Sequence, residues 1–204
     1  MFYREAGDFS ASYEEDSQTF PIKFDRYRYY LVLFIAIAVI PFVINDYWVN
    51  SLFLPFLIYA IAAIGLNILV GYCGQVSLGT GGFMAVGAYA CYKFMTAFPD
   101  VSMLVHVLLS GLVTAGVGVL FGLPSLRIKG FYLAVATLAA QFFLVWLFNR
   151  VPWFYNYSAS GQISAPERTF FGIEITGPNT QAWATYLFCL MLVIFSAYVA
   201  RNLT

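Results

Sequence analysis

Apolar residues occur along this chain in six long runs that are separated by polar segments. The runs cover residues 29–45, 51–70, 83–98, 101–123, 130–148 and 182–200. Each is near the roughly 20 residues that a helix needs to cross the hydrocarbon core of a bilayer, and the third is the shortest. Backbone groups in lipid must find hydrogen-bond partners within their own segment, so such runs predict helices. The expected fold is an all-α, polytopic transmembrane helical bundle of about six spans.

The polar segments predict how the spans are connected. Residues 1–28 are expected to form a tail outside the bilayer, residues 29–204 the transmembrane domain, and residues 149–181 an external loop within it. Lys and Arg are enriched on the cytoplasmic side of membrane proteins. If the tail is cytoplasmic, the inner segments hold most of these residues: Arg4, Lys23, Arg26, Arg28, Arg127, Lys129 and Arg201, against Lys93, Arg150 and Arg168 outside. A cytoplasmic N-terminus is therefore predicted.

Composition and charge exclude several classes of protein. Hydrophobic residues make up 61% of the chain and charged residues only 10%, which is far from the composition of a soluble globular domain. The net charge is zero and no basic face is present, so nucleic acid is not an expected partner. Cys73, Cys91 and Cys189 lack metal-ligand spacing and are interpreted as packing residues, so no metal site is expected.

Residues 71–82, GYCGQVSLGTGG, contain five glycines together with Gln75, Ser77 and Thr80. Glycine density of this kind is typical of a broken or re-entrant helix. In one interpretation this break lines a polar path through the membrane, with Gln75 and Ser77 exposed to a passing solute. In the other, equally weighted, it is a tight turn whose glycines only permit close packing.

Other polar or small residues within the spans have simpler interpretations. Asn67 and Gln141 are expected mainly to hydrogen-bond between helices, and Asn67 is also a candidate for the solute path. His106, the single histidine, is interpreted as a hydrogen-bonded packing residue or an interfacial group rather than a proton relay. One helix face carries small residues that predict close helix packing, namely Gly111, Ala115, Gly118 and Gly122.

The motifs of several enzyme and transporter classes are missing. The sequence has no GxxxxGK[ST] loop for ATP, no HExxH and no nucleophile elbow, so no catalytic residues and no cofactor are expected. Carboxylates are absent from the spans, which argues against coupling to protons or sodium ions. The chain is therefore expected to take its energy from a separate subunit or to act passively.

Two blocks of sequence resemble the permease subunits of branched-chain amino acid ABC importers, the Liv group. In residues 65–90 the matching positions are Gly71, Gly74, Gln75, Ser77, Leu78, Gly79, Phe83, Gly87, Ala88 and Tyr89. In residues 122–141 they are Arg127, Gly130, Tyr132, Leu133, Ala134, Thr137 and Leu138. Thr80 and Gly81 depart from the pattern, since many relatives carry a histidine followed by a small residue there. The polar tail resembles that of the M-type subunit.

The resemblance implies a pathway shared with a second permease subunit. Two cytoplasmic ATPase subunits and a periplasmic substrate-binding protein complete the importer, which lies in the bacterial inner membrane. Leucine, isoleucine and valine are the expected solutes, while urea or short amides remain open. A passive channel or facilitator and a non-transporting assembly protein are the rival functions. The chain ends at Thr204, where relatives enter an ATPase-docking segment, so it is expected to be the N-terminal portion of such a subunit.

Overall fold

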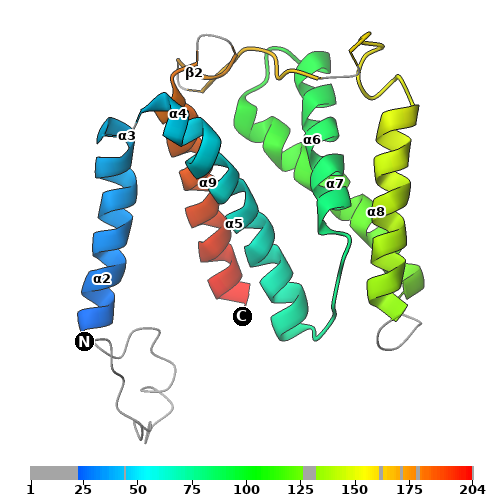
Figure 1. The fold of residues 1–204 in the computed structure, drawn as a ribbon, viewed down its shortest axis with the longest axis horizontal. Helices are drawn as coiled ribbons and strands as arrows, with labels where there is room; N and C mark the ends of the chain where they lie inside the picture. The colour runs from blue at the N-terminus through cyan, green and yellow to red at the C-terminus, as the bar shows by residue number, and fades with distance from the viewer. Residues whose placement is uncertain are drawn as a thin grey trace, which may run out of the picture. The chain divides into compact units, whose positions relative to one another are not determined.

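The computed structural model describes residues 23–43, 45–125, 132–160, 163–170, 172–177 and 180–203. Residues 1–22 of the predicted tail, and Arg4, Arg127 and Lys129 of the charge pattern, lie outside this part of the chain. The chain divides into two compact units, Met1–Ile44 and Asn45–Thr204. Figure 1 shows that the described residues of both units are mainly helical.

The described part of the first unit is one helical segment. It consists of α2 (Lys23–Phe34), a π-helical stretch η1 (Ile35–Val39) and α3 (Ile40–Val43). The helix begins at Lys23, so residues 23–28, which were expected in the polar tail, extend the first predicted span at its polar end. Lys, Arg and Asp are compatible with a helix when it leaves the apolar layer.

The second unit contains the remaining helices and a short hairpin. In chain order these are α4 (Asp46–Trp48), η2 (Val49–Phe53), α5 (Leu54–Asn67), η3 (Ile68–Tyr72), α6 (Thr80–Ala97), α7 (Met103–Ser125), α8 (Tyr132–Arg150), β1 (Arg168–Phe170), β2 (Ile173–Thr176) and α9 (Ala182–Leu203). The helical segments follow the six apolar runs in order. The expectation of an all-α transmembrane fold is confirmed.

Three helices of the described residues have both the length and the apolar composition needed to cross a membrane. They are Asp46–Tyr72, Met103–Leu123 and Ala182–Leu203. The apolar part of α8, Ala134–Arg150, is shorter. α6 is less apolar than these helices because it contains three glycines and Lys93. The outer faces carry large exposed apolar side chains, among them Leu112 at 70% and Phe56 at 66% exposure, as expected for a surface in contact with lipid.

Helices of the second unit pack in two groups. α5 packs along α9, where the rings of Phe53 and Tyr186 meet edge to face with centroids 6.1 Å apart. α6 packs against both α7 and α8, around a buried cluster of Val86, Leu144 and Phe148. Few direct contacts join α5 to α6, and Figure 1 shows the two groups separated along much of their length.

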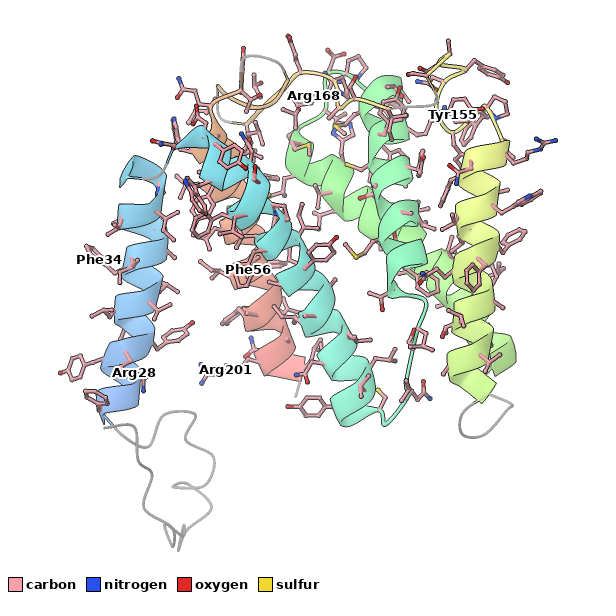
Figure 2. The ribbon with its side chains drawn as sticks, in the orientation of Figure 1. Arg28, Phe34, Phe56, Tyr155, Arg168 and Arg201 are labelled. Carbon is pink, nitrogen blue, oxygen red and sulfur yellow. The ribbon has the colours of Figure 1, made fainter. Side chains whose placement is uncertain are left out.

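A β-hairpin at the loop end of the second unit ties α9 to α6. The register pairs Thr169 with Glu174, and the Thr185 hydroxyl of α9 donates a 2.8 Å hydrogen bond to the Ile175 carbonyl. The Arg168 guanidinium donates to the Met95 carbonyl in the last turn of α6, where backbone carbonyls lack helical partners. Figure 2 shows Arg168 close to that end of α6. Part of the predicted loop 149–181 therefore has regular structure.

His106 stabilises the turn between α6 and α7. The ring is 0% exposed, with Nδ1 3.0 Å from the Ser102 carbonyl oxygen and Nε2 3.1 Å from the Phe98 carbonyl oxygen. Both partners can only accept hydrogen bonds, so a neutral ring donates to one of them, from the nitrogen that carries its proton. The interpretation of His106 as a hydrogen-bonded packing residue agrees with this geometry.

The helix between the second and third predicted spans is broken. η3 ends at Tyr72, a turn follows at Cys73, and residues 74–79 are not helical. Gly74 has a φ of 63°, a left-handed conformation that glycine adopts without a steric penalty. Figure 1 shows the segment running back from the end of α5 alongside the α6–α8 group before α6 begins. The structure therefore has the predicted break in place of a tight turn.

The break is held against α8. The Leu78 backbone N–H donates a 3.0 Å hydrogen bond to the Thr137 hydroxyl, which itself donates to the Ala134 carbonyl oxygen at 3.0 Å. At Gly79 a Cβ atom would lie 2.6 Å from the Thr137 carbonyl oxygen. Contacts this short do not occur for real Cβ atoms, so only glycine fits at this crossing without a shift.

We predict that Gly79→Ala destabilises the protein by about 1–3 kcal/mol, because the added methyl group must push the segment away from α8. Gly116→Ala is the matched control, since a Cβ there meets nothing within 4 Å. In the middle of α7 this control should be neutral or should stabilise by up to about 1 kcal/mol. Thermal unfolding of both variants in lipid nanodiscs measures the difference. Equal unfolding temperatures would contradict the proposed contact.

Candidate functional site

A cavity of about 360 Å³, here called the Gln75 cavity, lies beside the helix break. Its walls come from α5, η3, the non-helical residues 74–79, α6, α7 and α8. The lining residues are Ala62, Gly65, Leu66, Leu69, Gln75, Ser77, Thr80, Phe83, Gly118, Gly122 and Thr137. The cavity therefore brings together residues that are up to 75 positions apart in the sequence, Ala62 and Thr137 being the extremes.

Three of the four residues predicted for the solute path line this cavity. Gln75 and Ser77 come from the non-helical segment 74–79, and Thr80 is the first residue of α6. The Gln75 backbone N–H donates to the Leu69 carbonyl oxygen at 3.1 Å, and the Gly79 N–H donates to the Ser77 hydroxyl oxygen at 3.4 Å. Local hydrogen bonds thus fix the backbone that carries the amide and hydroxyl groups.

Asn67, the fourth predicted residue, is not brought into the cavity. The face of α5 and η3 that lines it carries Ala62, Gly65, Leu66 and Leu69, which follow the spacing i, i+3, i+4 and i+7. Asn67 lies off this face and its side chain is exposed. Its Oδ1 atom lies 3.4 Å from the position of a Cβ added to Gly71 in the next turn. The helical phase of α5 therefore separates Asn67 from the other predicted residues.

Thr137 was absent from the predicted site residues, although it belongs to the cavity wall. The side chain is 8% exposed, and its hydroxyl both accepts from Leu78 and donates to Ala134. The available signals were its place in the matching block 122–141 and the single threonine hydroxyl within the apolar run 130–148. Neither signal specifies which distant segment the hydroxyl contacts.

The small-residue face of α7 has a different environment from the one its spacing suggested. A Cβ added to Gly111, Gly118 or Gly122 would meet no heavy atom within 4 Å in the described structure. Gly118 and Gly122 line the Gln75 cavity, whereas Gly111 and Ala115 are exposed. The described helices of this chain do not approach these glycines closely, and the close helix packing expected from their spacing stays a prediction.

The closest glycine contacts in the helices involve α6. A Cβ at Gly82 would lie 3.0 Å from the Gln141 Cα atom, and one at Gly87 would lie 3.2 Å from the Thr114 Oγ1 atom. At Gly81 it would approach the Gln141 amide, at 3.5 Å from Oε1. Glycine on α6 therefore allows α7 and α8 to approach the helix that begins at the break.

The Gln75 cavity has a neutral, weakly polar lining. Its described lining residues include no Asp, Glu, Lys, Arg or His, and the polar side chains are one amide and three hydroxyl groups. Among the residues that the structure describes, no group of three or more His, Cys, Asp or Glu could hold a metal ion. The cavity can therefore offer hydrogen bonds and apolar contacts to a small molecule, whereas its side chains supply no strong acid or base.

Comparison with known proteins assigns the chain to a family. Residues 49–202 match the family model described as "Branched-chain amino acid transport system / permease component". The chain is 31% identical to the high-affinity branched-chain amino acid transport system permease protein LivM of Salmonella typhimurium, over 87% of this chain and 46% of that protein. LivM of Escherichia coli is 30% identical, with the same coverage of 87% and 46%. No solved structure matches.

The chain spans about half the length, 46%, of the two curated relatives it matches. The family match includes both blocks that carried the resemblance, at 65–90 and 122–141, and also contains the Gln75 cavity. The resemblance is therefore confirmed by an independent comparison. On this basis, the chain belongs to the family of branched-chain amino acid transport permease components.

Proposed function

We propose that this chain forms part of a permease subunit of an ATP-driven importer for branched-chain amino acids, and that the Gln75 cavity contributes to the solute path. The observation that carries the proposal is the cavity itself. It lies where a helix breaks beside α6–α8 and collects Gln75, Ser77, Thr80 and Thr137 around a neutral space. Non-helical backbone at membrane depth is tolerated where it is buried in protein or lines a cavity.

The chemistry of the lining suits a small zwitterion with an apolar side chain. Leucine, isoleucine and valine present an ammonium and a carboxylate group, which can hydrogen-bond to the Gln75 amide and to the hydroxyl groups. Leu66, Leu69 and Phe83 offer apolar contacts to the side chain of the solute. Conduction requires binding that is favourable enough for entry and weak enough for release, and neutral hydrogen bonds meet this condition better than ion pairs.

The proposed importer needs further subunits. A second permease subunit would complete the path, two cytoplasmic ATPase subunits would supply energy, and a periplasmic binding protein would deliver the solute. The sequence of this chain has no phosphate-binding loop, which supports a separate ATPase. We place the complex in the bacterial inner membrane, with the N-terminus of this chain in the cytoplasm as the distribution of Lys and Arg favours.

Uptake of labelled leucine tests the function. The protein that contains this sequence is reconstituted in proteoliposomes with a second permease subunit, an ATPase and a periplasmic binding protein. We expect uptake that requires ATP and is inhibited by isoleucine and valine but not by urea. An ATPase that binds but does not hydrolyse ATP serves as the control and should give background uptake. Leucine uptake that is independent of ATP would indicate a facilitator, and inhibition by urea alone would indicate an amide permease.

Accessibility of single cysteines tests the solute path. We expect Gln75→Cys and Ser77→Cys, in a background with Cys73, Cys91 and Cys189 replaced by serine, to react with a membrane-impermeant thiol reagent. Saturating leucine should slow both reactions because the solute occupies the same space. Leu112→Cys is the control, since Leu112 is 70% exposed on the outer face of α7 and should be shielded by lipid. Full protection of both cysteines in every nucleotide state would refute this path.

A further inference from the structure

A second cavity, here called the Lys93 cavity, lies between α6, α7, α8 and the segment that follows α8. Its volume is about 300 Å³, and it shares no lining residue with the Gln75 cavity. Aromatic rings form much of its wall: Tyr89 stacks on Phe148 with centroids 4.4 Å apart, and Phe154 meets Phe148 edge to face at 4.9 Å. These rings, with Val117 and Leu144, make an apolar chamber.

One charged group lies in this lining. Lys93 places its ammonium 4.2 Å from the centre of the Trp153 ring and donates a hydrogen bond to the Asn156 side-chain oxygen. Asn156 in turn donates to the Tyr92 hydroxyl at 2.9 Å, so the position of the ammonium is fixed by its neighbours. An ammonium has three N–H donors. No Asp or Glu belongs to the described lining, so no carboxylate of the cavity wall neutralises the charge.

The ammonium lies at the end of the cavity where water and lipid headgroups are expected. The segment after α8 carries Trp153 at 53% and Tyr157 at 75% exposure, and aromatic residues of this kind gather at membrane interfaces. Figure 2 shows Tyr155 of the same segment beyond the end of α8. Val86 lines the cavity seven residues before Lys93 on α6, which places it roughly 10 Å deeper along the helix.

The Lys93 cavity also reaches the outer face of the helices. Val113 lines it and is 40% exposed, and the neighbouring Leu112 and Leu109 are exposed apolar residues of α7. An apolar chamber with an opening on an apolar surface is accessible from the hydrocarbon layer. The Lys93 ammonium at the interfacial end of the cavity attracts an anion. The opposite end, around Val86 and Val117, offers no polar partner to a zwitterion.

We propose that the Lys93 cavity binds an anionic phospholipid, with an acyl chain between Val117, Leu144 and Phe148 and a phosphate oxygen that accepts a hydrogen bond from Lys93. Burial of methylene groups provides the binding free energy. The charge of Lys93 favours a headgroup with a net negative charge, because the choline group of a zwitterionic lipid would repel the ammonium. Trp153 and Asn156 hold the ammonium at the correct depth, so the lipid joins α6 to the segment after α8. This site is independent of the solute path.

Native mass spectrometry of the purified protein tests this proposal with phosphatidylglycerol and phosphatidylcholine as probes. Wild-type protein should retain phosphatidylglycerol in preference to phosphatidylcholine. Lys93→Gln should reduce this preference roughly tenfold, because it removes the cation that discriminates between a net negative and a zwitterionic headgroup. Arg150→Gln removes a cation at the same end of α8 that does not line the cavity, and it should leave the preference unchanged. Equal retention of both lipids by wild-type protein would overturn the proposal.

A second pair of variants tests the acyl-chain site without changing charge. Val117→Trp fills the cavity and should abolish retention of the lipid, whereas Val119→Trp adds the same group on the exposed face of α7 and should have no effect. Circular dichroism and thermal unfolding verify that each variant is folded. Unchanged lipid retention by a folded Val117→Trp variant would overturn the proposal. Crosslinking of a Val113→Cys variant to another permease chain would also overturn the proposal, because protein and not lipid would then cover the opening of the cavity.

Discussion

The hydrogen bond from the Leu78 N–H to the Thr137 hydroxyl is the contact on which the arrangement around the helix break depends. Residues 74–79 are not helical, so their backbone groups cannot use a helical ladder and need other hydrogen-bond partners. Thr137 supplies an acceptor from α8, and the absence of a side chain at Gly79 allows the two backbones to approach. This crossing fixes where α6 begins, and thereby where Gln75, Ser77 and Thr80 lie.

α6 forms a wall of two chemically different spaces. Its first turn, with Thr80 and Phe83, faces the Gln75 cavity, whereas Val86 to Lys93 faces the Lys93 cavity. The first space is neutral and offers an amide and hydroxyl groups, as suits a solute that must be released. The second is apolar with one fixed cation, as suits a lipid that stays bound. Both spaces rely on glycine residues of α6 that let α7 and α8 pack closely, such as Gly82 and Gly87.

The sequence was most informative where a property depends on neighbouring residues. Apolar runs located the ends of the helical segments to within six residues, and the glycines of residues 71–82 located the break. Contacts between distant segments were less predictable. Thr137 meets Leu78 59 positions away, which no local pattern specifies, and the phase of α5 turns Asn67 away from the cavity. The spacing of Gly111, Ala115, Gly118 and Gly122 identified one helix face, but not whether a helix or a cavity lies against it.

Hydrogen exchange of the Leu78 amide tests the central contact most directly. In lipid nanodiscs we expect slow exchange of the Leu78 amide in wild-type protein and in Thr137→Ser, because both keep a hydroxyl group as the acceptor. Thr137→Val removes the acceptor, so exchange at Leu78 should accelerate about five- to tenfold, the effect of losing a hydrogen bond worth about 1 kcal/mol or slightly more. Amides in the middle of α7 should be unchanged. Equal exchange at Leu78 in all three proteins would contradict the claim that Thr137 holds the break against α8.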